Sequence, residues 1–322
     1  MMFRSLLSSI KQKYTRRGVV LMYHRIATPL SDPWELSVSP EHFEEHLKVL
    51  KAYHVISIKE LADILGNKRR MATNTAIITF DDGYRDNYLA GKPLLEKYNL
   101  PATFFIPTNS IGEQQEFWWD ALERICLQSP NLPDKLILEQ PDNISWDIGN
   151  SGNMVSPADL YLNLCVILRK MPATQQQTFI KTLETWANNT NNRPEYFTMD
   201  KKELLDLQSG KLFTIGAHTM THPFLPDFPY NYQKSEIQGG ITHLEELTGN
   251  PIKYLAYPHG GRDQNTLDIL AESGVGLAFT TDPQHFKADT DKLTIPRFQV
   301  GNWDGKTFEF HLNNWMRNNT LA

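Results

Sequence analysis

The sequence predicts an α/β fold in which parallel strands form a barrel covered by helices. Seven short segments rich in β-branched and aromatic residues alternate with amphipathic helical patterns along most of the 322 residues. Such alternation is typical of parallel sheets, and seven strand–helix units in a chain of this length favour a barrel, open or closed, over a flat doubly wound sheet. Polar and ionisable residues also follow four of the strands directly, which is where barrels of this kind carry their active sites.

The predicted elements follow one another in a regular order. The strands are expected at residues 19–22, 55–58, 76–80, 103–106, 212–215, 254–257 and 277–280, and the helices at 40–52, 58–65, 87–98, 231–248 and 264–273. Ser39 and Ser57 are suited to begin helices because a hydroxyl can accept a hydrogen bond from a first-turn amide. Gly249 and Gly274 are suited to end helices because glycine readily adopts a left-handed backbone.

One stretch, from about 116 to 205, interrupts the alternation. It has few strand signals, many Asn, Gln and Pro residues, and apolar clusters at helical spacing such as Leu160, Leu164 and Leu168. We predict a helical insertion between strands four and five. Residues 18–322 are then one domain that carries this insertion, and residues 1–17 form a separate basic segment.

Composition excludes some classes of protein. The formal net charge is -5 and the pI about 6.1, so the chain does not resemble a nucleic-acid binder. Cys126 and Cys165 are far apart and flanked by apolar residues, so we interpret them as reduced core cysteines.

The N-terminal segment determines the expected location. It has no apolar run long enough for an export signal, and no later stretch is long enough to span a membrane, so we expect a cytoplasmic protein. Arg4, Lys11, Lys13, Arg16 and Arg17 all precede the first acidic residue, Asp32. They could form a short amphipathic segment at the inner, anionic membrane face. The alternative is a solvated helix or leader packed on the domain.

Two motifs carry the residues suited to bind a metal. His218 and His222 are four residues apart, which on a helical turn would direct both imidazoles to one ion. Asp81 and Asp82 follow a predicted strand and precede Gly83. Surface histidines and an exposed turn are the plain alternatives for each motif alone. Together, one aspartate and two histidines make a site with open positions, as a catalytic metal centre requires.

These motifs resemble those of the NodB-type polysaccharide deacetylases, carbohydrate esterase family four. The resemblance rests on residues 79–83 and 218–223, and extends to 101–106 and 255–260. It implies a distorted (β/α)7 barrel, of the circularly shifted branch similar to the poly-N-acetylglucosamine deacetylases. The implied reaction is hydrolysis of an N-acetyl group on a sugar of a polysaccharide, or of its lipid-linked precursor, with release of acetate. The alternatives are a deformylase, an O-deacetylase, or a hydrolase of a non-sugar amide.

The resemblance also implies roles for individual residues. Asp82, His218 and His222 would bind one divalent ion, zinc by preference, with cobalt or nickel as alternatives. Asp81 would be the general base that takes a proton from the attacking water. The general acid would be His24, which ends the first strand, whereas the common arrangement places this histidine near the C-terminus; His311 is the rival.

Substrate contacts are expected from a turn, an arginine and several aromatic residues. The metal and a backbone N–H in the turn Tyr257-Pro258-His259-Gly260 would stabilise the oxyanion, although many relatives have tyrosine where His259 stands. Arg297 would orient the base, with Arg262 and Arg85 as alternatives. The aromatic candidates for a sugar cleft are Tyr84, Trp118, Trp119 and Trp303. Trp118 and Trp119 could equally anchor the insertion.

Overall fold

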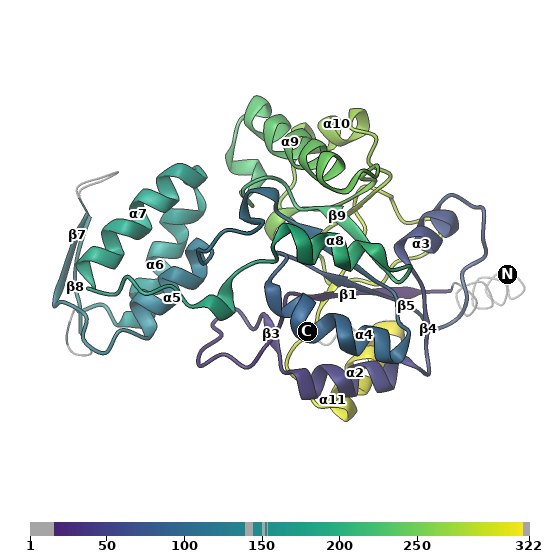
Figure 1. The fold of residues 1–322 in the computed structure, drawn as a ribbon, viewed down its shortest axis with the longest axis horizontal. Coiled ribbons are helices and arrows are strands. Elements are labelled where there is room, and N and C mark those ends of the chain that lie inside the picture. The colour runs from purple at the N-terminus through teal and green to yellow at the C-terminus, as the bar shows by residue number, and fades with distance from the viewer. Residues whose placement is uncertain (1–15, 139–143, 150–151, 153, 318–322) are drawn as a thin grey trace, which may run out of the picture.

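A curled sheet of mostly parallel strands forms the centre of the molecule. The computed structural model describes residues 16–138, 144–149, 152 and 154–317, so most of the predicted basic segment 1–17 lies outside the described residues. The strand order is β11-β10-β9-β6-β5-β1-β12, with β4 paired to β5. All these pairs are parallel, and helices cover the sheet (Figure 1). The prediction of an α/β barrel is confirmed.

The elements have the following bounds. The strands are β1 Gly18–Tyr23, β2 Arg25–Ile26, β3 Ser37–Val38, β4 His54–Val55, β5 Thr75–Phe80, β6 Ala102–Ile106, β7 Lys135–Leu138, β8 Ile144–Asp147, β9 Phe213–Ala217, β10 Tyr254–Ala256, β11 Leu277–Phe279 and β12 Phe298–Gln299. The longer helices are α2 Pro40–Leu50, α3 Ile58–Leu65, α4 Lys92–Tyr98, α5 Trp118–Leu127, α6 Pro157–Arg169, α7 Ala173–Trp186, α8 Lys201–Ser209, α9 Tyr230–Thr248, α10 Gln264–Glu272 and α11 Gly305–Arg317. A π-helical turn, η1 Asn87–Gly91, precedes α4, and 3-10 turns occupy Thr108–Ser110, Pro194–Tyr196, Leu225–Asp227 and Pro258–Gly260.

The barrel closes through a segment that the sequence analysis missed. Ile295 forms a parallel bridge with Phe279 of β11, and three residues later β12 pairs with β1. The segment that includes Ile295 and β12 therefore lies between β11 and β1. Conversely, the predicted strand 55–58 is wrong beyond its first residue, because Ser57 caps α3 in a reciprocal capping box with Glu60.

Alternate residues of the strands pack on opposite sides of the sheet. One set, including Leu21, Ile78 and Phe104, joins the core beneath the outer helices. The other set, including Ile77 and Phe105, forms a second core that contains the apolar face of α3. Because side chains alternate along a strand, the residues of β5 with odd residue numbers, such as Ile77, face this second core. The site described below begins on that side, with Asp81 directly after β5.

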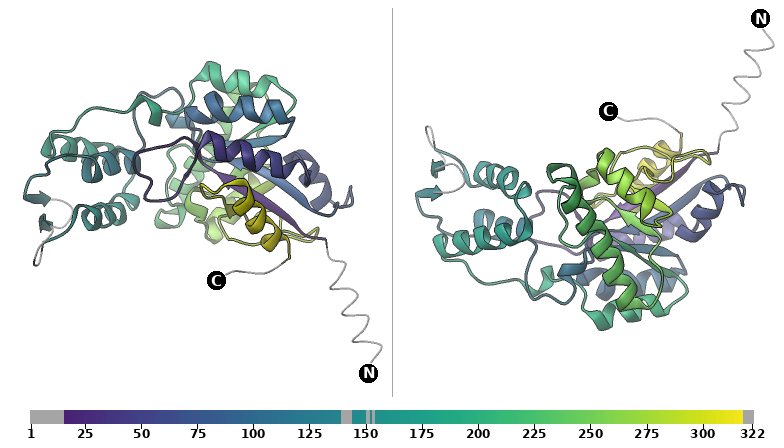
Figure 2. Two further views of the ribbon diagram at one scale, coloured as in Figure 1. Left: turned by 90° about the horizontal axis from the view of Figure 1, so that it is seen from below. Right: turned by 90° about the horizontal axis from the view of Figure 1, so that it is seen from above.

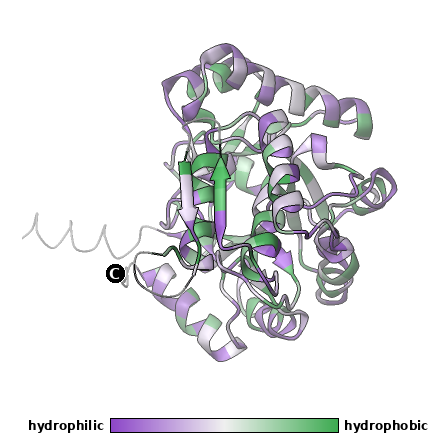
Figure 3. Cartoon of the chain, turned by 90° about the vertical axis from the view of Figure 1, so that its left-hand side faces the viewer, coloured by the Kyte–Doolittle hydropathy of each residue, from purple (hydrophilic) through white to green (hydrophobic). Residues whose placement is uncertain are grey.

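The insertion is a separate lobe of helices at one end of the barrel (Figures 1 and 2). Helices α5, α6 and α7 and the β7–β8 pair surround their own apolar core, which includes Cys126 and Cys165. Both cysteines are free and buried, as predicted. The antiparallel β7–β8 pair, which faces the viewer in Figure 3, was not predicted. Exposed and buried residues alternate in β7, but β8 has no buried residue, and each strand has only four residues, so the sequence signal is weak. Within the described residues, no helix is long and apolar enough to cross a bilayer.

Candidate active site

The predicted site residues meet at the carboxyl ends of the barrel strands. His24 follows β1, Asp81 and Asp82 follow β5, His218 follows β9, and His259 lies in the turn after β10. These strands are neighbours or near neighbours in the sheet, so their carboxyl ends share one rim (Figure 1). The parallel arrangement therefore brings together motifs as far apart in the chain as His24 and His259.

Asp82, His218 and His222 form a compact buried group. One potential ligand atom from each residue lies within 4.8 Å of the others. The Nε2 atoms of His218 and His222 are 3.4 and 3.2 Å from Oδ1 of Asp82. The Nδ1 of His218 is 2.8 Å from the carbonyl oxygen of Ala256, which favours the tautomer whose Nε2 is free to ligate.

This group fits a divalent cation. Among the described residues, Oδ1 of Asp82 is buried yet has no hydrogen-bond partner, although carboxylate oxygens normally find one when buried. Burial opposes ionisation of Asp82, but the two histidines outweigh it and hold the pKa of Asp82 well below its usual range. That stabilisation requires a proton on the imidazoles; in the neutral form, with Nδ1 of His218 donating to the Ala256 carbonyl, Nε2 of His218 instead directs a lone pair toward the Asp82 oxygen. A cation between these electron-rich atoms removes the repulsion.

The loop from His218 to His222 is not the helical turn that the spacing suggested. Thr219 and His222 have left-handed backbones, with φ of 65° and 61°, and the Thr219 hydroxyl accepts a hydrogen bond from the His222 amide. Glu236 of α9 accepts hydrogen bonds from the amides of Met220 and Thr221. This carboxylate holds the loop in shape, and the sequence analysis did not identify it because it lies on a distant helix.

Asp81 is held by Arg297. The guanidinium donates two hydrogen bonds to the carboxylate, of 2.7 and 2.6 Å, and is itself fully buried. It also donates to the Thr280 carbonyl and the Thr79 hydroxyl. Burial opposes ionisation of Asp81, but Arg297 and His218 outweigh it and lower the pKa of Asp81 below its ordinary value. The carboxylate is therefore ionised and fixed in orientation, as a general base requires.

The two rival arginines lie elsewhere. Arg262 pairs with Asp282 at 2.7 Å, and Arg85 pairs with Glu203 at the same distance. The structure thus brings Arg297, and neither alternative, to the Asp81 carboxylate.

His24 lies beside both aspartates, whereas His311 does not. The His24 imidazole is near enough to Asp81 and Asp82 to help lower the pKa of each. Its backbone carbonyl accepts a hydrogen bond of 2.7 Å from Asn87, in the π-helical turn after β5. Its Nδ1 is buried and has no hydrogen-bond partner among the described residues. His311 lies on α11 and instead stacks on Trp303, with the two ring centroids 4.0 Å apart.

The turn after β10 offers one amide to the site. The Tyr257 amide donates to the Phe279 carbonyl and the Gly260 amide to the Tyr257 carbonyl, while Pro258 has no N–H. Within this described turn, the His259 amide is left without a backbone acceptor. The exposed His259 side chain lies 4.6 Å from His222 between ring centroids. The Tyr257 side chain is structural, because it is buried and its hydroxyl donates to the Leu293 carbonyl.

The aromatic candidates separate into different environments. The expectation that Tyr84 lines a sugar cleft is wrong: it is fully buried, and its hydroxyl donates to Asp120 of α5 at 2.7 Å. Trp118 is half-buried against the core of the insertion, where it acts as an anchor. Trp119 reaches the site, with its ring 4.9 Å from that of His222, and its indole N–H donates to Tyr84. Trp303 stacks on the ring of His311 of α11.

The insertion contributes one more side chain that the sequence analysis missed. Arg169, the last residue of α6, places its guanidinium 4.7 Å from the centre of the Phe224 ring. Phe224 in turn lies 6.4 Å from His259. Arg169 is exposed, and among the described residues it forms no ion pair. No local sequence pattern distinguishes it from other helix-terminal arginines.

Comparison with known proteins agrees with the site. Residues 68–134 and 163–278, more than half of the chain, match the polysaccharide deacetylase family. A poly-beta-1,6-N-acetyl-D-glucosamine N-deacetylase of Staphylococcus aureus is 35% identical over 282 residues, which cover 87% of this chain and 72% of that protein. This chain belongs to the polysaccharide deacetylase family.

Other similar proteins extend the comparison. A deacetylase of the same name from Staphylococcus epidermidis is 23% identical and aligns with 92% of this chain and 86% of its own length. The putative polysaccharide deacetylase YxkH of Bacillus subtilis is 36% identical, but over only 36% of this chain and 41% of that protein. The deacetylase PplD of Streptococcus pyogenes and IcaB of Ammonifex degensii share the fold, each with a TM-score of 0.60. Their identities are 19% and 18%; each covers 94% of this chain, and 99% and 97% of the respective structure is covered.

Proposed function

We propose that this deacetylase hydrolyses the N-acetyl group of an amino sugar, in a glycan chain or its lipid-linked precursor, and depends on a divalent metal. The observation that carries the proposal is the buried Asp82, His218 and His222 group directly beside an Arg297-bound Asp81. The names of the two staphylococcal relatives support an N-linked acetyl group as the target. Zinc is the proposed ion, because two imidazoles and a carboxylate suit it, and cobalt or nickel would fit the same ligands.

Asp82, His218 and His222 would hold the ion. When bound, it would supply a Lewis acid that polarises the acetamide carbonyl and acidifies water. Asp81 accepts the proton as water attacks the carbonyl carbon, and Arg297 keeps the carboxylate ionised and correctly oriented. The His259 amide is placed to donate to the developing oxyanion.

His24 is the proposed general acid. Collapse of the tetrahedral intermediate breaks the C–N bond, and the leaving amine must gain a proton. The His24 imidazole lies beside both aspartates and has an unpaired buried Nδ1, so it can carry that proton to the amine. The products are acetate and a free amino sugar.

The test measures acetate release and metal content on the same samples. Wild-type protein is expected to hold about one divalent ion per chain and to release acetate from N-acetylglucosamine oligomers. Treatment with a chelator should abolish activity, and zinc should restore it. The double variant His218→Ala/His222→Ala should lose both the ion and the activity while its circular dichroism spectrum stays unchanged.

A matched control uses histidines outside the site. His42→Ala/His311→Ala changes two exposed or partly exposed histidines away from the group and should keep the metal. Stoichiometric metal in the His218/His222 double variant would refute the assignment of the centre. Acetate release from O-acetylated but not N-acetylated oligomers would refute the amide specificity alone.

A further inference from the structure

A cavity lies at the opposite end of the barrel from the catalytic residues. It has a volume of about 670 Å³ and is lined by Arg16, the segment 64–71 and the segment 287–290. Arg16 lies two residues before Gly18, the first residue of β1, which pairs with Phe286 through two backbone hydrogen bonds of 3.0 and 2.8 Å. The cavity therefore surrounds the amino end of β1. His24 follows the carboxyl end of this six-residue strand, roughly 20 Å away at 3.3 Å per residue.

Basic side chains surround this cavity, and some of them have no acidic partner. Arg69 pairs with Glu60, and Lys68 lies 4.0 Å from Asp63. Arg16, Arg70 and Lys287 form no ion pair among the described residues. The only acidic side chain in the lining is Asp289. A protein with a net charge of -5 thus concentrates positive charge at one place.

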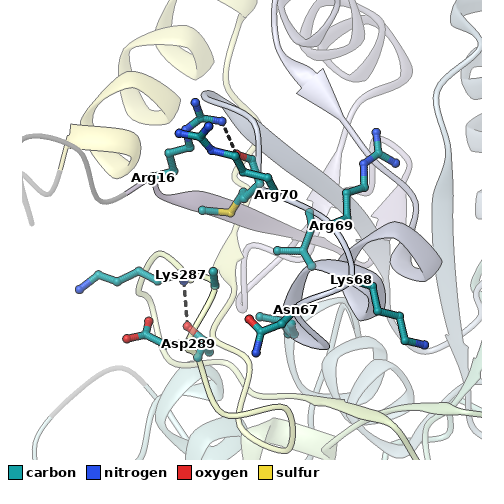
Figure 4. A pocket seen from close by; sticks show the side chains of 12 residues that line it. Arg16, Asn67, Lys68, Arg69, Arg70, Lys287 and Asp289 are labelled. Carbon is teal, nitrogen blue, oxygen red and sulfur yellow. Dashed lines mark hydrogen bonds between the residues drawn. The ribbon is translucent and has the colours of Figure 1, made fainter.

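Two of these cations lie next to each other. Arg16 donates a hydrogen bond of 2.6 Å to the carbonyl of Met71, the residue that follows Arg70. Figure 4 shows the Arg16 and Arg70 side chains on the same side of the cavity, with Lys287 on a neighbouring wall. Adjacent guanidinium groups repel each other, and an anion between them removes the repulsion. Phosphate oxygens suit this geometry because a guanidinium can donate two hydrogen bonds to them.

We propose that this cavity binds the phosphate-bearing headgroups of anionic lipids and holds the deacetylase against a membrane surface. Residues 67–70 are all exposed, so the cations lie on an open face rather than around an enclosed ligand. Arg16 also lies at the entry of β1 beside the exposed segment 67–70, so the cations of this face come from separate parts of the chain. Docking at the amino ends of the strands directs the catalytic rim away from the lipid. The proposal does not depend on the chemistry of the catalytic site.

The experiment measures sedimentation of the full chain with phospholipid vesicles. At about 0.1 M salt, binding to phosphatidylglycerol vesicles is expected and binding to phosphatidylcholine vesicles is not, since the attraction is electrostatic. The triple variant Arg16→Gln/Arg70→Gln/Lys287→Gln should bind about a hundredfold more weakly, because each basic side chain contributes about fivefold at an anionic surface. A second variant, Arg70→Glu/Lys287→Glu, keeps the hydrogen bond from Arg16 to the Met71 carbonyl. Loss of vesicle binding in this variant therefore cannot be attributed to loss of that structural contact.

A control of equal charge makes the result specific. Lys201→Gln/Lys202→Gln/Lys211→Gln removes the same charge from exposed positions outside the cavity and should retain vesicle binding. Equal loss in both triple variants, or unchanged binding in the cavity variants, would overturn the proposal. Thermal stabilisation by inorganic pyrophosphate without any vesicle binding would overturn the lipid assignment in favour of a soluble phosphate ligand. Acetate release from soluble oligomers is expected to be the same in all these variants.

Discussion

The barrel and the insertion both reach the catalytic centre, but they contribute different kinds of side chain. The barrel supplies the ionisable groups, and their partners are buried and fixed: Asp81 receives two hydrogen bonds from Arg297, and His218 is tied to the Ala256 carbonyl. The insertion supplies Trp119 and Arg169, which border the site. The barrel thus holds the candidate catalytic groups, whereas the insertion contributes side chains at their border.

The largest expected effect separates the two neighbouring aspartates of the barrel. Asp81→Asn should keep the metal and lower kcat by about 10²–10⁴-fold, the usual range for loss of a general base. Asp82→Asn should weaken metal binding, because it removes a ligand. Metal content and single-substrate kinetics on both variants measure this. Metal loss in Asp81→Asn with retention in Asp82→Asn would reverse the two roles.

A related change tests how Arg297 acts. The arginine lowers the pKa of Asp81, so Arg297→Lys, which loses the two-bond geometry, should raise that pKa. The acidic limb of the pH–rate profile should then move to higher pH, because Asp81 must be ionised to accept a proton. An unchanged limb together with reduced thermal stability would mean that Arg297 only supports the fold.

Next in size is the effect of removing the proposed acid. His24→Ala should leave metal content unchanged and lower kcat more than it changes KM, the pattern of a group that acts in the transition state. The deficit should shrink with an activated ester, whose leaving group needs no proton. His311→Ala, on α11, is the matched control and should resemble wild type. Near-normal activity in His24→Ala with an inactive His311→Ala would move the acid to the C-terminal helix.

A smaller effect is expected from the insertion. Arg169→Gln should raise KM for glycan oligomers several-fold and leave kcat unchanged, because Arg169 borders the site without contacting the Asp82 group. Arg169→Lys should recover only part of this loss, since lysine stacks less well on Phe224. Steady-state kinetics with short and long oligomers measure the effect. A fall in kcat at constant KM would show that the insertion takes part in the chemical step.

The smallest expected effect concerns Asp120, where the insertion meets the barrel. Burial raises its pKa to about 8, despite the charge of Arg25 and the Tyr84 hydrogen bond. An unfolded aspartate has a pKa near 4. The folded state therefore binds the extra proton between about pH 4 and 8, and this group makes stability fall as pH rises through that window. In Asp120→Asn, melting temperatures at pH 5 and 8.5 should differ less than in wild type. An equal pH dependence in both proteins would contradict the raised pKa.

Much of the barrel and its candidate metal-binding group could be predicted from the sequence because their signals are local. Short apolar runs rich in β-branched and aromatic residues identified β1, β5, β6, β9, β10 and β11, and helical periodicity identified the helices around them. Asp81 and Asp82 directly follow one strand, and His218 follows another. The parallel architecture alone places such strand ends on one rim. The sequence therefore determined which residues gather, although it suggested the wrong conformation for the His218–His222 loop.

The tertiary structure decided the features that depend on distant partners. Arg297 contacts Asp81 from 216 residues away, and only closure of the barrel by the segment after β11 selects it over Arg262 and Arg85. Trp119, and not Trp118, reaches the site because α5 turns that face toward His222. Tyr84 is buried where the insertion meets the barrel, and its hydroxyl donates to Asp120 of the insertion. A local pattern contains no information about which distant side chain will fill a given space, so these assignments follow from packing.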